Sequence, residues 1–203
     1  MQHVAHSMHT LSGQPAFAGL ESTATTVPGV IVSERVGVAI ASVLARKGRT
    51  QELANRVRAQ FGIELPVGPR MTRAPGLAFV GIGVAAWLAL SDTADVPSAL
   101  QAELGECASL SDHSSALALL RLTGAKVRAT LAKLLPLDLH DRAFGILNAA
   151  SSVAAHVSTR IWRLEDSEHG AVFELGVPRS FAVSFAQALQ TSAAEFGLVF
   201  KPG

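Results

Sequence analysis

Three short polar clusters contain the residue types that acid–base and nucleophilic chemistry use. Asp138-Leu139-His140-Asp141-Arg142 sets an acid on either side of an imidazole soon after Pro136. A nearby carboxylate can turn a histidine into a base. In a loop, however, this spacing more often serves turn hydrogen bonds or a partner contact. We therefore predict a structural or subunit-interface role for Asp138, His140 and Arg142.

The second cluster, Asp112-His113-Ser114, has the residue types of a catalytic triad. Neighbours on a strand point to opposite faces of a sheet, so these three side chains are not expected to act together. The other predicted structural or interface residues are His156, placed in a strand among small residues, and Arg179 and Phe181, which open the last helix. The sequence thus predicts no catalytic, cofactor-binding or metal-binding residue in this chain.

Metal and thiol chemistry has little sequence support. No G-x-S-x-G, P-loop, H-E-x-x-H or paired-cysteine motif occurs. His3, His6 and His9 would share one face of a helix, but terminal tails rarely preorganise a metal site. Cys107 is the sole cysteine, which excludes an internal disulfide and a cysteine-based structural zinc site. We expect Cys107 to be an inert core residue.

Gly81-Ile82-Gly83-Val84-Ala85-Ala86 superficially matches a dinucleotide-binding fingerprint. That fingerprint needs a following helix, whose N-terminus takes up the pyrophosphate. Trp87-Leu88-Ala89-Leu90 instead continues as a strand and breaks at Ser91-Asp92. The segment is therefore predicted to be a hairpin of two buried strands.

The composition restricts the class of partner. The chain has 203 residues, of which 49% are hydrophobic and 16% charged, against an average of about 25% charged. Some apolar surface is therefore expected to meet another protein. A net charge of +1 gives no electrostatic reason to expect nucleic acid or a membrane as partner. The start lacks the pattern of a secretory signal, which predicts a cytoplasmic protein.

Hydrophobic periodicity predicts an alternation of strands and helices. Thr50 and Thr123 are expected to cap two of the helices, and Gly62 to end the first. The predicted strands are 35–46, two within 77–90, 107–110, 115–122, 153–164 and 171–177. The predicted helices are 50–61, 97–104, 125–135 and 179–196, the last with Phe181, Phe185, Leu189, Ser192 and Phe196 on one face.

This order predicts an α+β fold made of two fused split β-α-β units, with antiparallel sheets and helices on one face of each. Residues 1–29 are expected to form an irregular arm. Residues 30–203 are expected to form a single domain of two pseudo-repeats, 30–110 and 111–203. Because each repeat is small, the two sheets should share a core.

Ordered motifs along the chain resemble a known family. In the first half they are Val43-Leu44-Ala45-Arg46-Lys47-Gly48, Phe61-Gly62-Ile63-Glu64-Leu65-Pro66, Gly68-Pro69-Arg70, Phe79-Val80-Gly81 and Trp87-Leu88-Ala89. In the second half they are Ser111-Asp112, Leu120-Arg121-Leu122-Thr123-Gly124, Asp138-Leu139-His140, Arg142-Ala143-Phe144, Ala155-His156-Val157, Trp162, Arg179-Ser180-Phe181 and Ser192-Ala193-Ala194-Glu195-Phe196-Gly197. From about Ser33 onward, the sequence resembles the gamma subunits of heterotetrameric sarcosine oxidase.

The resemblance implies a fold related to the folate-binding T-protein of the glycine cleavage system. It also implies a complex that oxidatively demethylates sarcosine to glycine, with hydrogen peroxide and formaldehyde, or 5,10-methylenetetrahydrofolate, as further products. The implied partners are alpha, beta and delta subunits, which would carry FAD, FMN, NAD and zinc. The gamma subunit would be structural and non-catalytic.

The sequence departs from the family pattern at two places. Ala186-Gln187-Ala188 replaces expected aromatic residues, and His113 stands where glutamine is expected. An equivalent subunit of a related N-methyl amino acid enzyme, such as one acting on N-methylglutamate, is therefore an alternative. A free-standing folate-dependent one-carbon protein is another. A third, an iron–sulfur assembly protein, is disfavoured because Cys107 lies outside the expected Lys-Gly context.

Overall fold

The first strand of the protein buries Val30, Val32 and Glu34 on one face. In β1, Val30–Arg35, every second side chain is buried, as expected for a strand with one face on a core. The computed structural model describes residues 15–17, 20–23, 27–93 and 95–201. The three N-terminal histidines singled out above lie outside these residues.

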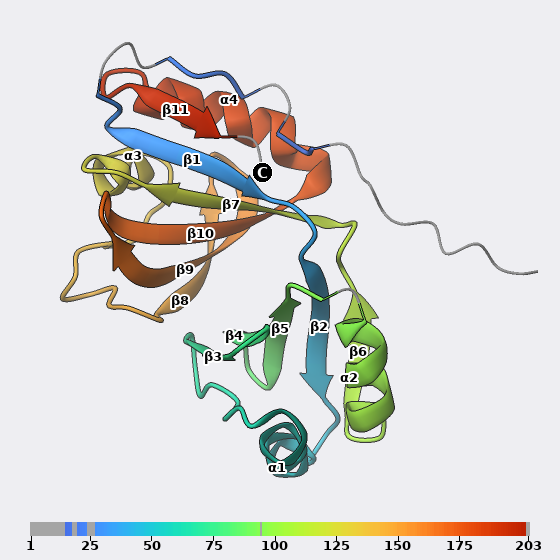
Figure 1. Ribbon diagram of the computed structural model, residues 1–203. Coiled ribbons are helices and arrows are strands. Elements are labelled where there is room, and N and C mark those ends of the chain that lie inside the picture. Colours follow the sequence, from blue (N-terminus) through green and yellow to red (C-terminus); the bar gives the residue numbers. More distant parts are fainter. Residues whose placement is uncertain (1–14, 18–19, 24–26, 94, 202–203) are drawn as a thin grey trace, which may run out of the picture.

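The larger of two sheets has six strands in the order β11-β1-β7-β10-β9-β8 (Figure 1). Its remaining strands are β7 (Leu117–Thr123), β8 (Ala149–Ala154), β9 (Val157–Ser167), β10 (Gly170–Pro178) and β11 (Leu198–Lys201). Neighbouring strands are antiparallel, except that β1 and β11 run parallel.

The smaller sheet has five antiparallel strands in the order β3-β4-β5-β2-β6. They are β2 (Ala39–Ala45), β3 (Met71–Ala74), β4 (Leu77–Gly83), β5 (Ala86–Ser91) and β6 (Ala108–Asp112). β4 and β5 form the predicted hairpin, so Gly81-Ile82-Gly83 is followed by a strand and does not provide the helix that a dinucleotide would need.

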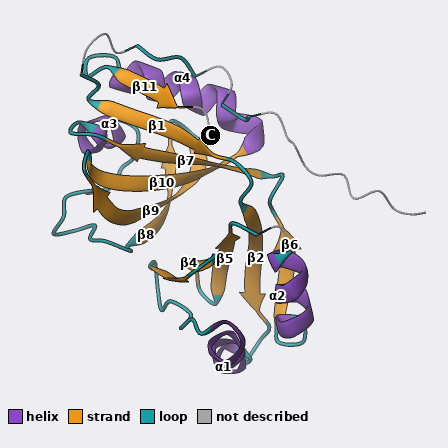
Figure 2. Cartoon of the chain, viewed as in Figure 1, coloured by secondary structure: helices purple, strands orange, loops and turns teal. Residues whose placement is uncertain are grey.

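Helices cover the outer face of each sheet, and the two inner faces pack together (Figure 2). The helical elements are α1 (Thr50–Phe61), α2 (Val96–Leu104), α3 (Val127–Ala132), the 3-10 turn η1 (Arg179–Phe181) and α4 (Ala182–Ala193). Leu53 and Leu100 hold α1 and α2 on the smaller sheet, and Phe185 holds α4 on the larger one. Ile40 and Trp162 belong to the core that the two sheets share.

The elements occur twice in the same order. β2-α1-β3-β4-β5-α2-β6 and β7-α3-β8-β9-β10-α4-β11 both read strand, helix, three strands, helix, strand. The corresponding strands also take the same places in the two sheets, with β1 added between β7 and β11. β1 therefore belongs to the sheet of the second half, whereas the predicted repeat boundaries had grouped it with the first. The division into one domain with repeats 30–110 and 111–203 stays a prediction.

The described part of the N-terminal arm is irregular and lies on the larger sheet. Phe17 is fully buried in the core between the larger sheet and its helices. The carboxylate of buried Glu34 accepts hydrogen bonds from the backbone N–H groups of Ala16, at 2.8 Å, and Phe17, at 3.2 Å. This part of the arm is held by packing and by a buried carboxylate.

Several predicted boundaries were wrong for local reasons. The strand predicted at 35–46 is divided between two sheets, because the chain crosses from β1 to β2 at residues 36–38. The strand predicted at 153–164 is a hairpin, since Ala155 and His156 adopt φ values of 47° and 68°. Strands β3 and β11 were not predicted.

The helix predictions were correct in place but not in detail. Gly62 ends α1 at a φ of 66°, as expected. Thr50 and Thr123 make no capping hydrogen bond, and α3 is only six residues long. Thr123 ends β7, where its hydroxyl lies 3.2 Å from that of Ser167.

Candidate functional site: the cleft between the two sheets

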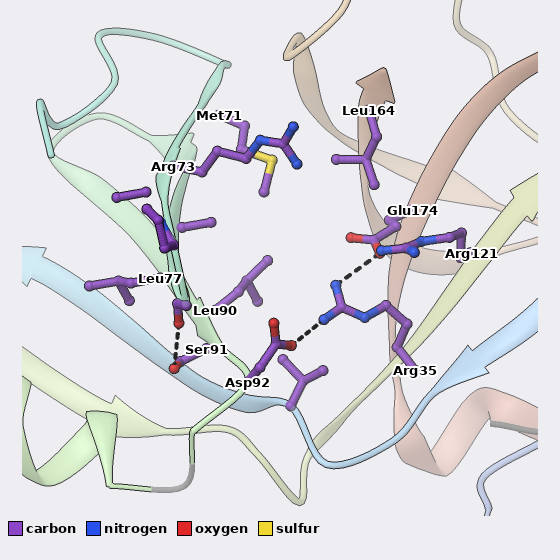
Figure 3. A pocket seen from close by; sticks show the side chains of 15 residues that line it. Arg35, Met71, Arg73, Leu77, Leu90, Ser91, Asp92, Arg121, Leu164 and Glu174 are labelled. Carbon is purple, nitrogen blue, oxygen red and sulfur yellow. Dashed lines mark hydrogen bonds and ion pairs between the residues drawn. The ribbon is translucent and has the colours of Figure 1, made fainter. Parts of the chain in front are cut away.

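A cleft of about 460 Å³ opens where the two sheets diverge. The larger sheet contributes Arg35, Arg121 and Glu174, and the smaller one contributes Arg73 on β3 and Asp92 just after β5 (Figure 3). Aliphatic side chains of both sheets complete the wall. A shallow, part-polar hollow of this kind is the first place to look for a binding or catalytic site.

Glu174 is the centre of the polar network in this cleft. Its side chain is 1% exposed. Oε1 accepts hydrogen bonds from Nε and Nη2 of Arg121, at 2.9 and 2.7 Å, and from Nη1 of Arg35, at 3.0 Å. Oε2 accepts one from the indole N–H of Trp162, at 2.8 Å. A buried carboxylate is stable only with such compensation.

Arg35 connects the two sheets through its guanidinium. One nitrogen donates to Glu174 in the larger sheet, and the other donates to Asp92 beside the smaller one. Near the rim, Arg73 forms an ion pair with Glu165, again between the sheets. The polar side chains of the cleft therefore act as ties between the two halves.

The charged side chains of this cleft are engaged with one another. Each of the three arginines named here is paired with a carboxylate, and Glu174 already accepts four hydrogen bonds. These contacts clamp neighbouring strands of the larger sheet together and tie the larger sheet to the smaller one.

Sequence reasoning missed this cluster, although a signal was present. Glu174 is the one charged residue in the apolar strand segment 171–177, and Arg121 is the one charged residue in 116–122. A charge inside a buried strand has to find a partner of opposite sign. Pairing these two isolated charges would have predicted the contact between β7 and β10.

The loop around Asp138 makes the local hydrogen bonds that its composition suggested. Asp138 Oδ1 accepts from the His140 N–H at 2.9 Å, and His140 Nδ1 accepts from the Arg142 N–H at 3.2 Å. All three side chains lie on the surface. Whether Asp138, His140 and Arg142 also contact another subunit stays a prediction.

Asp141 connects this loop to the larger sheet. Its carboxylate pairs with Arg128 of α3 and with Arg163, a buried residue of β9. Burial opposes the charge of Arg163, but side-chain hydrogen bonds from its guanidinium to Asp166 and Asp141 outweigh that effect and raise its pKa. The loop is thereby fixed by a permanently charged side chain.

Asp112, His113 and Ser114 do not form a triad. Asp112 Oδ1 accepts from the Ser114 hydroxyl at 2.6 Å and from the Ser114 N–H at 2.8 Å. These two hydrogen bonds lower the pKa of Asp112. His113 Nε2 instead lies 3.2 Å from the hydroxyl of Ser42. Asp112 thus orients Ser114 directly, and the imidazole of His113 takes no part in these hydrogen bonds.

Two of the predicted interface residues lie in unexpected surroundings. His156 occupies an exposed hairpin turn, because the strand reverses there. Phe181 is 50% exposed, since α4 begins one residue later and buries Ala182 and Phe185 instead. Arg179 lies in η1, and its backbone N–H donates to Ala116 O at 2.8 Å. An interface role for His156, Arg179 and Phe181 stays a prediction.

Metal and thiol sites find no support in the residues that the structure describes. They contain no group of three His, Cys, Asp or Glu side chains that could hold a metal ion. Cys107 is fully buried, and its thiol donates to Leu104 O at 3.3 Å. None of the described helices is both long and apolar enough to span a bilayer.

Comparison with known proteins decides the family. The sequence pattern of the sarcosine oxidase gamma subunit family matches residues 47–195. The chain belongs to this family. A gamma subunit of sarcosine oxidase from Arthrobacter sp. is 28% identical over 144 residues, which cover 68% of this chain and 70% of that protein.

Solved structures confirm the fold of this gamma-family chain. A chain of the heterotetrameric sarcosine oxidase of Corynebacterium sp. U-96, solved with pyrrole 2-carboxylate, superposes with a TM-score of 0.75 at 23% identity, covering 89% of this chain and 92% of that one. The glycine cleavage aminomethyltransferase T of Bartonella henselae superposes with a TM-score of 0.61 at 14% identity. That match covers 86% of this chain and 48% of the aminomethyltransferase. The predicted kinship in fold with the T-protein is therefore correct.

Proposed function

We propose that this chain is the structural gamma subunit of a heterotetrameric sarcosine oxidase. The complex would oxidatively demethylate sarcosine to glycine and produce hydrogen peroxide with formaldehyde, or with 5,10-methylenetetrahydrofolate when tetrahydrofolate is present. Its alpha, beta and delta subunits would carry FAD, FMN, NAD and zinc. The family match over residues 47–195 carries this proposal. A cytoplasmic location stays a prediction.

The surface of the chain supports a role inside a larger assembly. Charged residues are scarce, and several large aliphatic or aromatic side chains are more than two-fifths exposed. These side chains are Val27, Val36, Leu44, Val67, Val84, Ile146, Val153, Phe181 and Val183. A partner that covered these side chains would remove their apolar area from water.

The polar clusters support a structural role for this chain. Glu174, Asp138 and Asp141 each accept hydrogen bonds from neighbouring groups of the same chain. Their charges hold strands and loops together. Catalysis would then be the task of the partner subunits, as the family resemblance implies.

Co-expression of the four subunits tests the proposal. A tagged form of this chain should recover its companions in a fixed ratio, with the absorption spectrum of bound flavin and with turnover of sarcosine. The chain purified alone should show neither. A stable monomer that recovers no flavoprotein from its native extract would refute the proposal.

The second candidate is the same structural role in an enzyme for another N-methyl amino acid. His113 and Ala186-Gln187-Ala188, which depart from the expected pattern, favour it. The purified assembly would be assayed with sarcosine and with N-methylglutamate under the same conditions. Higher kcat/KM with sarcosine supports the first proposal, and the reverse order supports the second.

A free-standing folate enzyme is tested with the chain alone. The superposition on the aminomethyltransferase, with a TM-score of 0.61 at 14% identity, shows a common fold and does not extend to its ligand. Titration of the isolated chain with tetrahydrofolate in a calorimeter should give no heat beyond dilution. Saturable binding would favour a free-standing folate-dependent one-carbon protein.

A further inference from the structure

Strand β6 forms an edge of the smaller sheet, since β2 is its sole strand neighbour among the described residues. Two backbone bonds fix which groups of β6 face outward. Arg46 N–H donates to Cys107 O at 2.8 Å, and His113 N–H donates to Ile40 O at 2.7 Å. Because hydrogen-bonded pairs alternate in an antiparallel ladder, the backbone groups of Leu110 and Asp112 point away from β2.

A groove of about 520 Å³ lies along the junction of β6 and α2. Its floor includes Ala41 and Leu110, and α2 lines it with Pro97, Gln101 and Ala102. Side chains of an added strand would reach this groove at every second residue. An open edge beside a partly apolar groove is the geometry of recognition by strand addition.

The other half of the chain shows what can fill this junction. By element order, β11 corresponds to β6 and α4 corresponds to α2. There, residues 21–23 of the N-terminal arm lie beside the edge strand and its helix. Thr23 N–H donates to Leu198 O at 2.7 Å.

Two further bonds hold that arm. Phe200 N–H on β11 donates to the Ser22 hydroxyl at 2.9 Å, and Gln190 Nε2 on α4 donates to Glu21 O at 3.1 Å. The arm therefore bridges the edge strand and its covering helix. The junction of β6 and α2 is likewise formed by an edge strand and a helix. In the described structure this junction contains a groove where the other half has the arm.

We propose that the edge of β6 binds an extended segment of a companion subunit, which occupies the junction that the arm fills in the other half. The identity of the partner rests on the proposed function. Leu110 and Asp112 supply the backbone bonds, and the α2 groove takes small or aliphatic side chains. Asp112 is the charged residue of the groove lining, so the segment carries a basic or neutral residue beside it and no acidic one.

A proline substitution isolates the backbone contact. Proline removes the N–H of Leu110, which β2 does not use, so an edge strand should tolerate Leu110→Pro. Leu110→Ala keeps the N–H and shortens the side chain, and it is the matched control. We expect at least tenfold weaker capture of companion subunits by Leu110→Pro, a much smaller loss for Leu110→Ala, and similar melting temperatures for both.

Hydrogen exchange provides a second measurement that does not depend on how the proline variant folds. The amides of Leu110 and Asp112 should exchange more slowly in the wild-type complex than in the isolated chain. Equal capture by Leu110→Pro, or equal exchange in both states, overturns this inference while leaving the proposed function intact. Self-association through β6 also overturns it, since the occupant is then a second copy. Failure of the wild-type chain to capture any flavoprotein overturns the proposed function instead.

Discussion

Glu174 on β10 lies directly opposite Arg121 on β7, and its buried Oε1 accepts two hydrogen bonds from that guanidinium. Arg35 adds a third donor from β1. One carboxylate thus unites three adjacent strands of the larger sheet, and Arg35 extends the connection to Asp92 beside the smaller sheet.

Loss of the Glu174 charge should destabilise the fold and leave turnover by the assembled complex unchanged. Glu174→Gln leaves two guanidinium groups facing a neutral amide, and removing one member of a buried pair costs about 3–5 kcal/mol. Because the side chains of Arg35 and Arg121 are partly exposed, we expect the lower end of that range. For a chain of this size the melting temperature should fall by about 6–12 °C.

Glu168→Gln is the matched control for Glu174→Gln. Glu168 lies in the exposed turn after β9, so the same chemical change should leave the melting temperature within about 1 °C, as for ordinary surface substitutions. Turnover per assembled complex of the proposed oxidase should be unchanged in both variants. A stable Glu174→Gln complex that does not turn over would assign catalytic work to Glu174.

Gly81 is needed for close packing of the backbone. A Cβ on Gly81 would lie 2.1 Å from Gly68 O, whereas one on Gly83 would meet only ordinary contact, at 3.7 Å from the Ala86 Cβ. Gly81→Ala should cost at least about 2 kcal/mol, as overpacking does. Gly83→Ala should cost less than about 1 kcal/mol. Urea unfolding of the two variants checks this, and equal midpoints would contradict it.

The β8–β9 hairpin holds two non-glycine residues in left-handed conformations. Ala155 and His156 have φ values of 47° and 68°, which Asn-Gly adopts readily in a type I′ turn. The double variant Ala155→Asn/His156→Gly should therefore gain about 1–2 kcal/mol. Thermal unfolding measures the gain. A lower melting temperature would show that the native side chains contribute more than the strain costs.

The same double variant tests the interface role of His156. If His156 contacts a companion subunit, the variant should be more stable alone yet capture fewer companions. Ala155→Asn by itself is the control, because it keeps the imidazole. Unchanged capture by both variants would exclude an energetic contribution of His156 to assembly.

Asp112 should contribute stability at neutral pH and lose it in acid. Hydrogen bonds from Ser114 lower its pKa below the ordinary value of 3.8. A carboxyl whose pKa is lowered by folding stabilises the protein above its unfolded pKa, and the contribution disappears as the pH falls through the folded value. Asp112→Asn should therefore be less stable than wild type at pH 7, with the difference shrinking below about pH 4. Urea unfolding at several pH values tests this, and a pH-independent difference would contradict it.

Substitutions in the 138–142 loop should affect assembly before turnover. Asp138→Ala removes the acceptor for the His140 N–H, and His140→Ala removes the acceptor for the Arg142 N–H. Both should loosen a surface loop at a cost of about 1 kcal/mol. Gel filtration should then show less of the proposed complex, with normal turnover per assembled complex. Full assembly without turnover would reveal catalysis in this loop.

Much of the chain is determined by local sequence. Apolar alternation gave most strands, Gly62 ended the first helix, and the run from Leu77 to Leu90 made a hairpin. These features depend on residues a few positions apart, so periodicity and backbone preference suffice to predict them. The same information predicted a doubled alternation of strands and helices, although it missed β3 and β11. The family was recognised from the resemblance of ordered motifs along the chain.

Tertiary structure alone decided which distant segments meet. β1 joins the sheet of the second half, and β11 pairs with it across more than 160 residues of sequence. The cleft depends on the same kind of contact, because Arg35, Asp92 and Glu174 come together only when the two sheets pack. Burial and charge pairing between remote residues set these choices, and no short stretch of sequence contains both partners.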